Sequence, residues 1–140
     1  MSAASRWAGA RRILCIRLDN VGDVLMTTPA IRALRASGPD RHVALLTSSV
    51  GAIVAPLVPE IDETLVFDAP WMKSTGNEPT QDAAVIERLR AGRFDAAVVF
   101  TVYSQNPQPA AYLAYLAGIP LRLAHCRENP YQLLTDWVPE

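Results

Sequence analysis

The hydrophobic pattern is clearest near the start of the chain, over residues 13–35. An apolar run, Ile13–Ile16, is followed by a polar turn over 17–23 and by an amphipathic segment over 24–35. A short apolar run predicts a buried strand, and apolar residues three and four positions apart predict a helix. A strand that leads through a loop into a helix is the opening unit of an α/β sheet.

Similar units follow along the rest of the chain. The apolar runs predict strands at residues 12–18, 42–47, 64–67, 94–100 and 121–126. The segments between them predict helices at about 22–36, 80–91 and 109–117, a short helix after Ser48 or Ser49 through Val58, and the start of another helix in the tail after 127. Pro29 either kinks the first helix or marks a second helix start behind Thr28. This alternation predicts an α/β fold with a Rossmann-like, doubly wound parallel sheet.

The size and composition of the chain indicate one globular domain. It has 140 residues, half of them apolar and 19% charged. We expect a flexible N-terminus at 1–11, a Rossmann-like domain at 12–136 and the start of a linker at 137–140. Cys15 and Cys126 lie in apolar runs without a C-x-x-C pair, so we expect buried thiols in a reducing compartment. The sequence alone leaves a disulfide open.

The charge and the apolar runs bear on partners and location. The formal net charge is −1, so no overall attraction to nucleic acid exists and we expect no nucleic-acid partner. No apolar run reaches the ~20 residues of a membrane span. The basic residues 1–12 are not followed by the hydrophobic region of a signal peptide. These observations favour the cytoplasm, either in solution or in peripheral contact with the inner face of the cytoplasmic membrane.

Polar loops follow each predicted strand. The carboxyl ends of parallel strands lie at one edge of a sheet, where α/β folds bind ligands. We therefore expect five loops to meet there, at residues 19–23, 47–49, 68–73, 101–105 and 125–129. Their carboxylates, hydroxyls, amides and cations suit a polyhydroxylated or phosphorylated ligand.

Asp23 is the candidate base among these residues. It follows Gly22 at the start of a helix, where free N–H groups and the helix dipole favour a negative charge. An ionised carboxylate that faces a cleft can accept a proton from an attacking hydroxyl, but aspartate at this position is also a common helix cap. Asp19 is expected to make an Asx-type turn near Gly22. Gly22 itself serves either close approach of a ligand or a positive φ.

The remaining candidates each have a binding and a structural interpretation. Arg17 either binds a phosphate or carboxylate in bidentate fashion or pairs with Asp19 or Asp68. Trp71 and Lys73 either stack on a sugar and pair with an acid, or Trp71 anchors its loop in the core. The polar loop with Tyr103, Ser104 and Gln105 binds ligand hydroxyls or holds its own turn. His125 and Cys126 lack further ligands at metal spacing, so we expect no metal site.

Common motifs are absent from the chain. The first loop has one glycine where a dinucleotide fingerprint needs three, and G-x-x-x-x-G-K-[ST] and G-x-S-x-G do not occur. NAD binding, P-loop chemistry and the hydrolase nucleophile elbow are therefore disfavoured. A flavodoxin-like or receiver-like domain needs an acidic cluster or phosphate loop after the first strand, which Asp19 and Asp23 supply only in part.

The chain resembles a known family over nearly its whole length after residue 11. The segment RLDNVGDVLMTTPAIRALR at 17–35 resembles the opening of bacterial glycosyltransferase family 9, the heptosyltransferases of lipopolysaccharide core. The segments at 46–71, 94–125 and 126–140 are similar to later parts of that family. The resemblance implies half of a GT-B fold, in which an amino-terminal domain binds the acceptor and a carboxyl-terminal domain binds an ADP-sugar. It also implies an inverting, metal-independent reaction without a cofactor, with Asp23 as general base.

On this resemblance, the expected function is the acceptor-binding half of an inverting transferase that uses a donor such as ADP-heptose. The acceptor would be a glycan or lipid-linked saccharide, and the donor-binding domain is absent from the 140 residues. Acidic groups of the acceptor would be held by Arg17, Lys73 and Arg127, and the other expected acceptor-binding residues are Asp19, Gly22, Trp71, Tyr103, Ser104 and Gln105. The alternative is a non-catalytic α/β module, left by truncation, that binds a glycan or a partner.

Overall fold

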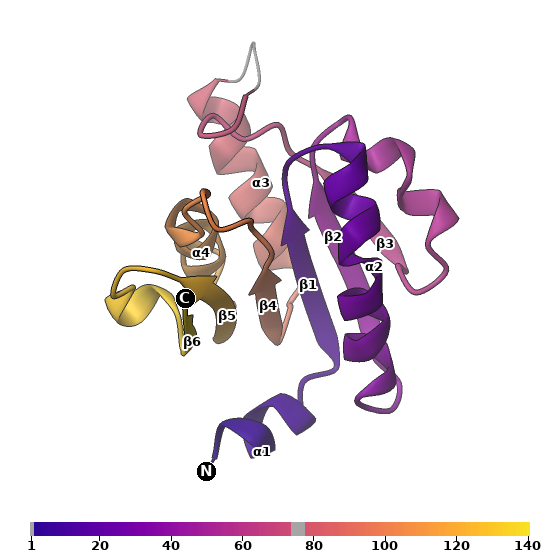
Figure 1. Cartoon of the computed structure of the whole chain (residues 1–140), viewed down its shortest axis with the longest axis vertical. Coiled ribbons are helices and arrows are strands. Elements are labelled where there is room, and N and C mark those ends of the chain that lie inside the picture. The colour runs from indigo at the N-terminus through magenta and orange to yellow at the C-terminus, as the bar shows by residue number, and fades with distance from the viewer. Residues whose placement is uncertain (1, 74–77) are drawn as a thin grey trace.

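A computed structural model describes residues 2–73 and 78–140. Within these residues the chain forms a six-stranded sheet in the order β3-β2-β1-β4-β5-β6, and all five pairings are parallel (Figure 1). The strands are β1 Arg12–Arg17, β2 His42–Thr47, β3 Glu63–Val66, β4 Ala96–Val99, β5 Leu121–Cys126 and β6 Asp136–Pro139. The predicted Rossmann-like, doubly wound parallel sheet is confirmed.

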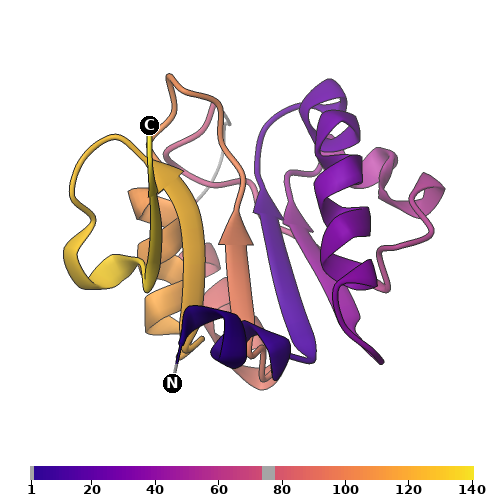
Figure 2. The same ribbon diagram turned by 60° about the horizontal axis from the view of Figure 1, so that its bottom comes forward.

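Helices cover the two faces of this sheet (Figure 2). The helices are α1 Ala3–Ala8, α2 Val21–Ala36, α3 Pro79–Ala91 and α4 Gln108–Leu116, with short 3₁₀ turns η1 Gly51–Ile53, η2 Ala55–Leu57 and η3 Tyr131–Leu133. α1 and α2 lie on one face, and α3 and α4 lie on the other. In the chain, α2 follows the carboxyl end of β1 after a loop of three residues, 18–20.

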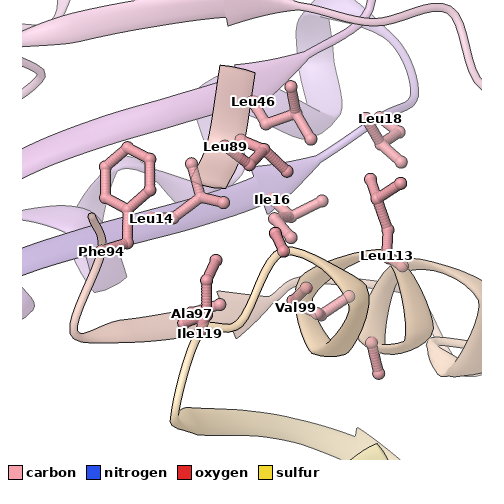
Figure 3. Close-up of a cluster of buried hydrophobic side chains, with 14 of the residues drawn as sticks. Leu14, Ile16, Leu18, Leu46, Leu89, Phe94, Ala97, Val99, Leu113 and Ile119 are labelled. Carbon is pink, nitrogen blue, oxygen red and sulfur yellow. The ribbon is translucent and has the colours of Figure 1, made fainter. Parts of the chain in front are cut away.

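The two cores follow from the alternation of side chains along the strands. On β1, Ile13 and Cys15 pack in a cluster with Val24 and Ile31 of α2. Leu14 and Ile16 point to the opposite face, where they pack in a second cluster that includes Leu89 of α3 (Figure 3). Because β1 is buried on both faces, its sequence is a continuous apolar run rather than an alternating one.

The helices begin and end close to the expected positions. α2 runs without interruption through Pro29, which lies on its exposed side, so Pro29 does not mark a second helix start. α3 begins at Pro79, one residue before the expected cap Thr80, and ends at Gly92 as expected. The segment 48–58 contains two 3₁₀ turns, η1 and η2, and not one helix. Pro56 has no N–H group with which to continue an α-helical hydrogen-bond pattern.

Both ends of the chain are more ordered than the sequence suggested. Residues 3–8 form α1, and Trp7 donates from Nε1 to Asp136 Oδ2 at 3.0 Å. The tail contains η3 and the edge strand β6 where we expected a helix and the start of a linker. Trp137 Nε1 donates to the carbonyl of Cys126 at 2.7 Å, and Pro139 is tolerated at the end of an edge strand.

Candidate functional site

The carboxyl edge of the sheet carries a polar cleft of about 550 Å³. Four of the five loops expected to meet at this edge line it, those at 19–23, 47–49, 68–73 and 101–105. The polar residues around it are Asp19, Asn20, Asp23, Ser48, Ser49, Asp68, Lys73 and Gln105. The fifth loop lies beside them, because Arg127 and Glu128 share a smaller depression with Gln105. The predicted meeting of the loops is therefore observed.

Asp23 lies in the first turn of α2 and faces the cleft. Its Oδ2 accepts a hydrogen bond from the backbone N–H of Asn20 at 3.1 Å. Its Oδ1 lies 3.3 Å from Nη2 of Arg17, and the side chain remains 30% exposed. The carboxylate thus caps the helix, is held by two donors, and still reaches the cleft. The two interpretations of Asp23 as a cap and as a positioned carboxylate are compatible.

A buried network lies beneath Asp23. Arg17 donates from Nε and Nη2 to the two oxygens of Asp19, at 2.7 and 3.0 Å. Asp19 Oδ2 also accepts from Gln105 Nε2 at 3.0 Å, which connects the first loop to the loop after β4. The side chains of Arg17 and Asp19 are only 8% and 9% exposed. Arg17 is held by Asp19 and in turn contacts Asp23. Asp19 connects to Gln105 in place of making the expected Asx-type turn.

The serine pair after β2 forms the floor of the cleft. Ser48 Oγ donates to the carbonyl of Asp19 at 2.7 Å and accepts from the N–H of Gly51 at 3.0 Å. Ser49 donates to Asp68 Oδ1 from both its N–H and its Oγ. These bonds fix three neighbouring loops relative to one another, so the floor is rigid where it approaches Asp23.

The other predicted site residues are distributed around the edge. Lys73 lines the polar cleft, and Trp71 and Ser104 line an adjoining hollow. Trp71 is 36% exposed and makes an edge contact with Phe67, with ring centroids 5.7 Å apart. Arg127 lies over the Tyr103 ring at 4.6 Å, which joins the loops after β4 and β5.

Gly22 is exposed in the first turn of α2. A Cβ added there would have no neighbour within 4 Å, and its φ is not positive. The interpretation of Gly22 as a positive-φ position is therefore wrong, and the surroundings of Gly22 are compatible with the close approach of another molecule.

Sequence reasoning did not single out several residues that line the cleft. These residues lie in the loops that were expected to converge but were not named as site residues: Asn20, Ser48, Ser49, Asp68 and Met72. Their signal was positional, since each lies within a few residues of a strand's carboxyl end. Residue type alone did not separate them from ordinary turn residues.

The cysteines do not provide a nucleophile at this edge. Cys15 and Cys126 are both unpaired and buried, as expected for thiols in strands. Burial raises the pKa of the Cys15 thiol to about 12, so this group stays protonated at neutral pH. Over residues 2–73 and 78–140, no group of three or more His, Cys, Asp or Glu side chains is arranged to hold a metal ion. None of the helices in the same ranges has the length and apolarity that a membrane crossing requires.

Comparisons with known proteins show which proteins this chain is similar to. No protein-family profile matches the chain. A protein of Haemophilus influenzae named "Putative glycosyltransferase" is 31% identical over 113 residues, which are 81% of this chain and 30% of that protein.

Two solved structures share the fold and part of the sequence. A glycosyl transferase family 9 protein of Veillonella parvula has a TM-score of 0.72 and 25% identity, over 91% of this chain and 36% of its own. An ADP-heptose lipopolysaccharide heptosyltransferase II of E. coli has a TM-score of 0.68 and 26% identity, over 90% of this chain and 34% of its own. The chain thus spans about a third of the length of each of these three proteins.

Proposed function

Because the chain is related to the family 9 glycosyltransferases over about a third of their length, we propose that it is the acceptor-binding half of an inverting glycosyltransferase. The observation that carries this proposal is Asp23, a held carboxylate at the mouth of a polar cleft. The relatives support the reaction class, and the geometry around Asp23 supports its proposed role as the base.

In the proposed reaction, a hydroxyl of the acceptor attacks the anomeric carbon of a nucleotide sugar. The bond from that carbon to the diphosphate oxygen breaks, and the configuration of the carbon inverts. Asp23 accepts the proton of the attacking hydroxyl. General base catalysis by a positioned carboxylate contributes roughly 10²–10⁴-fold to such a step. Each oxygen of Asp23 has one protein donor, which leaves acceptor capacity on both for the incoming hydroxyl.

The roles of the neighbouring residues follow from their exposure. Lys73 is exposed on the cleft and is suited to an acidic group of the acceptor. Ser49 and Asp68 also line the cleft and, in this proposal, offer groups to sugar hydroxyls. Arg17 lies below the surface and holds Asp23 in place. In this proposal Arg17 is a positioning residue, whereas Lys73, Gln105 and Arg127 contact the acceptor side.

The donor and the setting are part of the same proposal. We infer a nucleotide sugar such as ADP-heptose, bound by a second domain that faces the cleft, because one of the structural relatives is named for that donor. The acceptor is a glycan or lipid-linked saccharide. The reaction is proposed to proceed without a metal or a cofactor, in the cytoplasm or at the inner face of its membrane.

The proposal is tested by Asp23→Asn in the longest natural protein that contains these 140 residues. Transfer from ADP-heptose to a lipopolysaccharide-core acceptor is measured, and kcat is expected to fall by roughly 10²–10⁴-fold. The control is Asp40→Asn, the same chemical change at an exposed residue whose φ of 54° asparagine also tolerates. Near-normal turnover in Asp23→Asn would reject Asp23 as the base. No transfer by the unmodified protein, with acceptor binding retained, would instead favour a binding module.

A further inference from the structure

A second hollow adjoins the polar cleft. It has a volume of about 270 Å³ and is called the side pocket here. Leu18, Asp19, Met72 and Gln105 line both hollows, so these residues form the wall between them. The side pocket therefore adjoins the cleft in which Asp23 lies.

The two hollows differ in chemistry. The side pocket is lined by buried core side chains, including Ile16, Leu18 and Val99. It is also lined by the large, partly exposed side chains of Trp71, Met72 and Phe100. Uncharged groups lie at its rim, contributed by Thr101, Ser104, Gln105 and Asn106. The polar cleft, in contrast, contains Asp23, Asp68 and Lys73.

Among the described residues that line the side pocket, Asp19 is the one that carries a charge, and it already has its partners. Asp19 accepts two hydrogen bonds from Arg17 and one from Gln105, and its side chain is 9% exposed. A charged ligand group in the side pocket would lose its hydration without gaining an opposite charge. An apolar group would lose only contact with water, which is favourable. The pocket thus selects against charge and for apolar surface.

We propose that the side pocket binds an apolar substituent attached to the acceptor sugar, such as a short alkyl or acyl group, while the sugar lies in the polar cleft. This inference rests on the proposed function, because it takes the cleft as the acceptor site. An enclosed apolar cavity of ~150 Å³ can hold benzene, so 270 Å³ is sufficient for a group of this size. The substrate class is therefore an amphipathic saccharide and not a fully hydrophilic one.

The test is a binding series on the 140-residue chain, with methyl, ethyl, propyl and butyl β-D-glucopyranoside as probes. Each added methylene is expected to lower Kd roughly fourfold, the factor that corresponds to about 0.8 kcal/mol per buried CH₂. Methyl resonances in NMR spectra locate the probe. Ile16 and Val99 line the side pocket but not the polar cleft and report on the side pocket, whereas Leu34 and Leu123 report on an apolar groove beside α1 and α2.

Two tryptophan variants provide the comparison. Trp71→Ala removes one wall of the side pocket and is expected to reduce the gain per methylene to less than twofold. Trp137→Ala removes a similarly exposed tryptophan from β6, outside the pocket, and is expected to leave the gain unchanged. A Kd independent of chain length, no binding of butyl glucoside, or shifts confined to Leu34 and Leu123 would overturn the inference.

The outcome is independent of the test of Asp23. If the chain-length effect is present but the longer protein transfers no sugar, the side pocket stands and the proposed transferase fails. If transfer depends on Asp23 but affinity ignores chain length, the transferase stands and the apolar substituent is rejected.

Discussion

Aspartate and arginine residues lie at both edges of the sheet, but their roles differ between the amino edge and the carboxyl edge. At the amino edge, Asp95 accepts the N–H groups of Arg11 and Arg12, both at 2.9 Å, and Asp62 accepts the N–H of Val43 at 2.8 Å. These carboxylates close turns at strand starts. At the carboxyl edge, Asp19 and Arg17 lie buried beneath the cleft, and Asp23 and Lys73 remain on its surface.

This difference shows where the chain can do chemistry. The acids at the amino edge bind backbone N–H groups, so their geometry is used to hold strands in register. The acids at the carboxyl edge are arranged in two layers, a buried layer that fixes the loops and an outer layer that faces solvent. A rigid support below exposed groups is what a preorganised site requires.

The largest expected effect comes from removing the buried support. Arg17→Met leaves Asp19 buried with Gln105 as its remaining side-chain donor, and loss of one partner of a buried ion pair costs about 3–5 kcal/mol. The matched change at the amino edge is Arg11→Met, in an exposed pair with Asp40 worth about 0–1 kcal/mol. Urea unfolding measures both. Equal losses would contradict the distinction between the buried layer and the surface.

Two glycines near the cleft, Gly51 and Gly22, differ in the space that surrounds them. A Cβ at Gly51 would lie 2.1 Å from Oγ1 of the buried Thr47, so Gly51→Ala should cost about 1–3 kcal/mol through overpacking. At Gly22 a Cβ meets nothing within 4 Å, and Gly22→Ala should leave stability unchanged or raise it by up to about 1 kcal/mol.

The same two variants also test whether another molecule approaches α2 at Gly22. Thermal unfolding gives their stability, and transfer by the longer protein gives their activity. If another molecule approaches α2 closely, Gly22→Ala will reduce activity without loss of stability. Full activity in this variant would show that the open space above Gly22 is not used.

The smallest effect concerns acid stability at the amino edge. Burial alone would raise the pKa of Asp62, but hydrogen bonds from the Val43 N–H and from Arg35, together with the charges of Arg35 and His42, lower it overall. A lowered carboxyl pKa contributes stability above the unfolded value of ~3.9, and this contribution is lost as the pH falls below it. Asp62→Asn should therefore flatten the fall in the urea midpoint between pH 5 and 3. Asp40→Asn, at an exposed site, should leave it unchanged.

The sequence predicted the parts of the fold that have a strong local pattern. β2 and β5 begin and end at the expected residues, because each is an apolar run between clear turn residues. β6 was missed because only four residues pair at the sheet edge and one of them is Pro139. The pairing of β6 with β5 depends on tertiary contacts such as that of Trp137 with Cys126, which no local pattern records.

The sequence predicted the candidate site to about the same extent as the fold. The position of Asp23 follows from the strand, loop and helix that surround it, so it was found from sequence. The bridge between Asp19 and Gln105 joins residues 86 positions apart and was not visible there. The expectation that Arg17 either binds a ligand or pairs with an acid was resolved by burial, which depends on how the loops pack. The acceptor contacts of Lys73, Trp71 and Arg127 remain predictions.

The strand order has a consequence for how the chain folds as it is synthesised. β1 precedes the other five strands of the sheet in the chain, yet it lies at the centre of the sheet between β2 and β4. Its pairing with β4 joins Ile13 to Ala96, so at 5–20 residues per second the second neighbour emerges from the ribosome roughly 4–16 s later. During that interval β1 can pair only with β2, under the cover of α2. The nascent chain therefore exposes one unpaired edge of a strand that the folded protein buries on both faces, and this edge is where a chaperone or a misfolded pairing would first act.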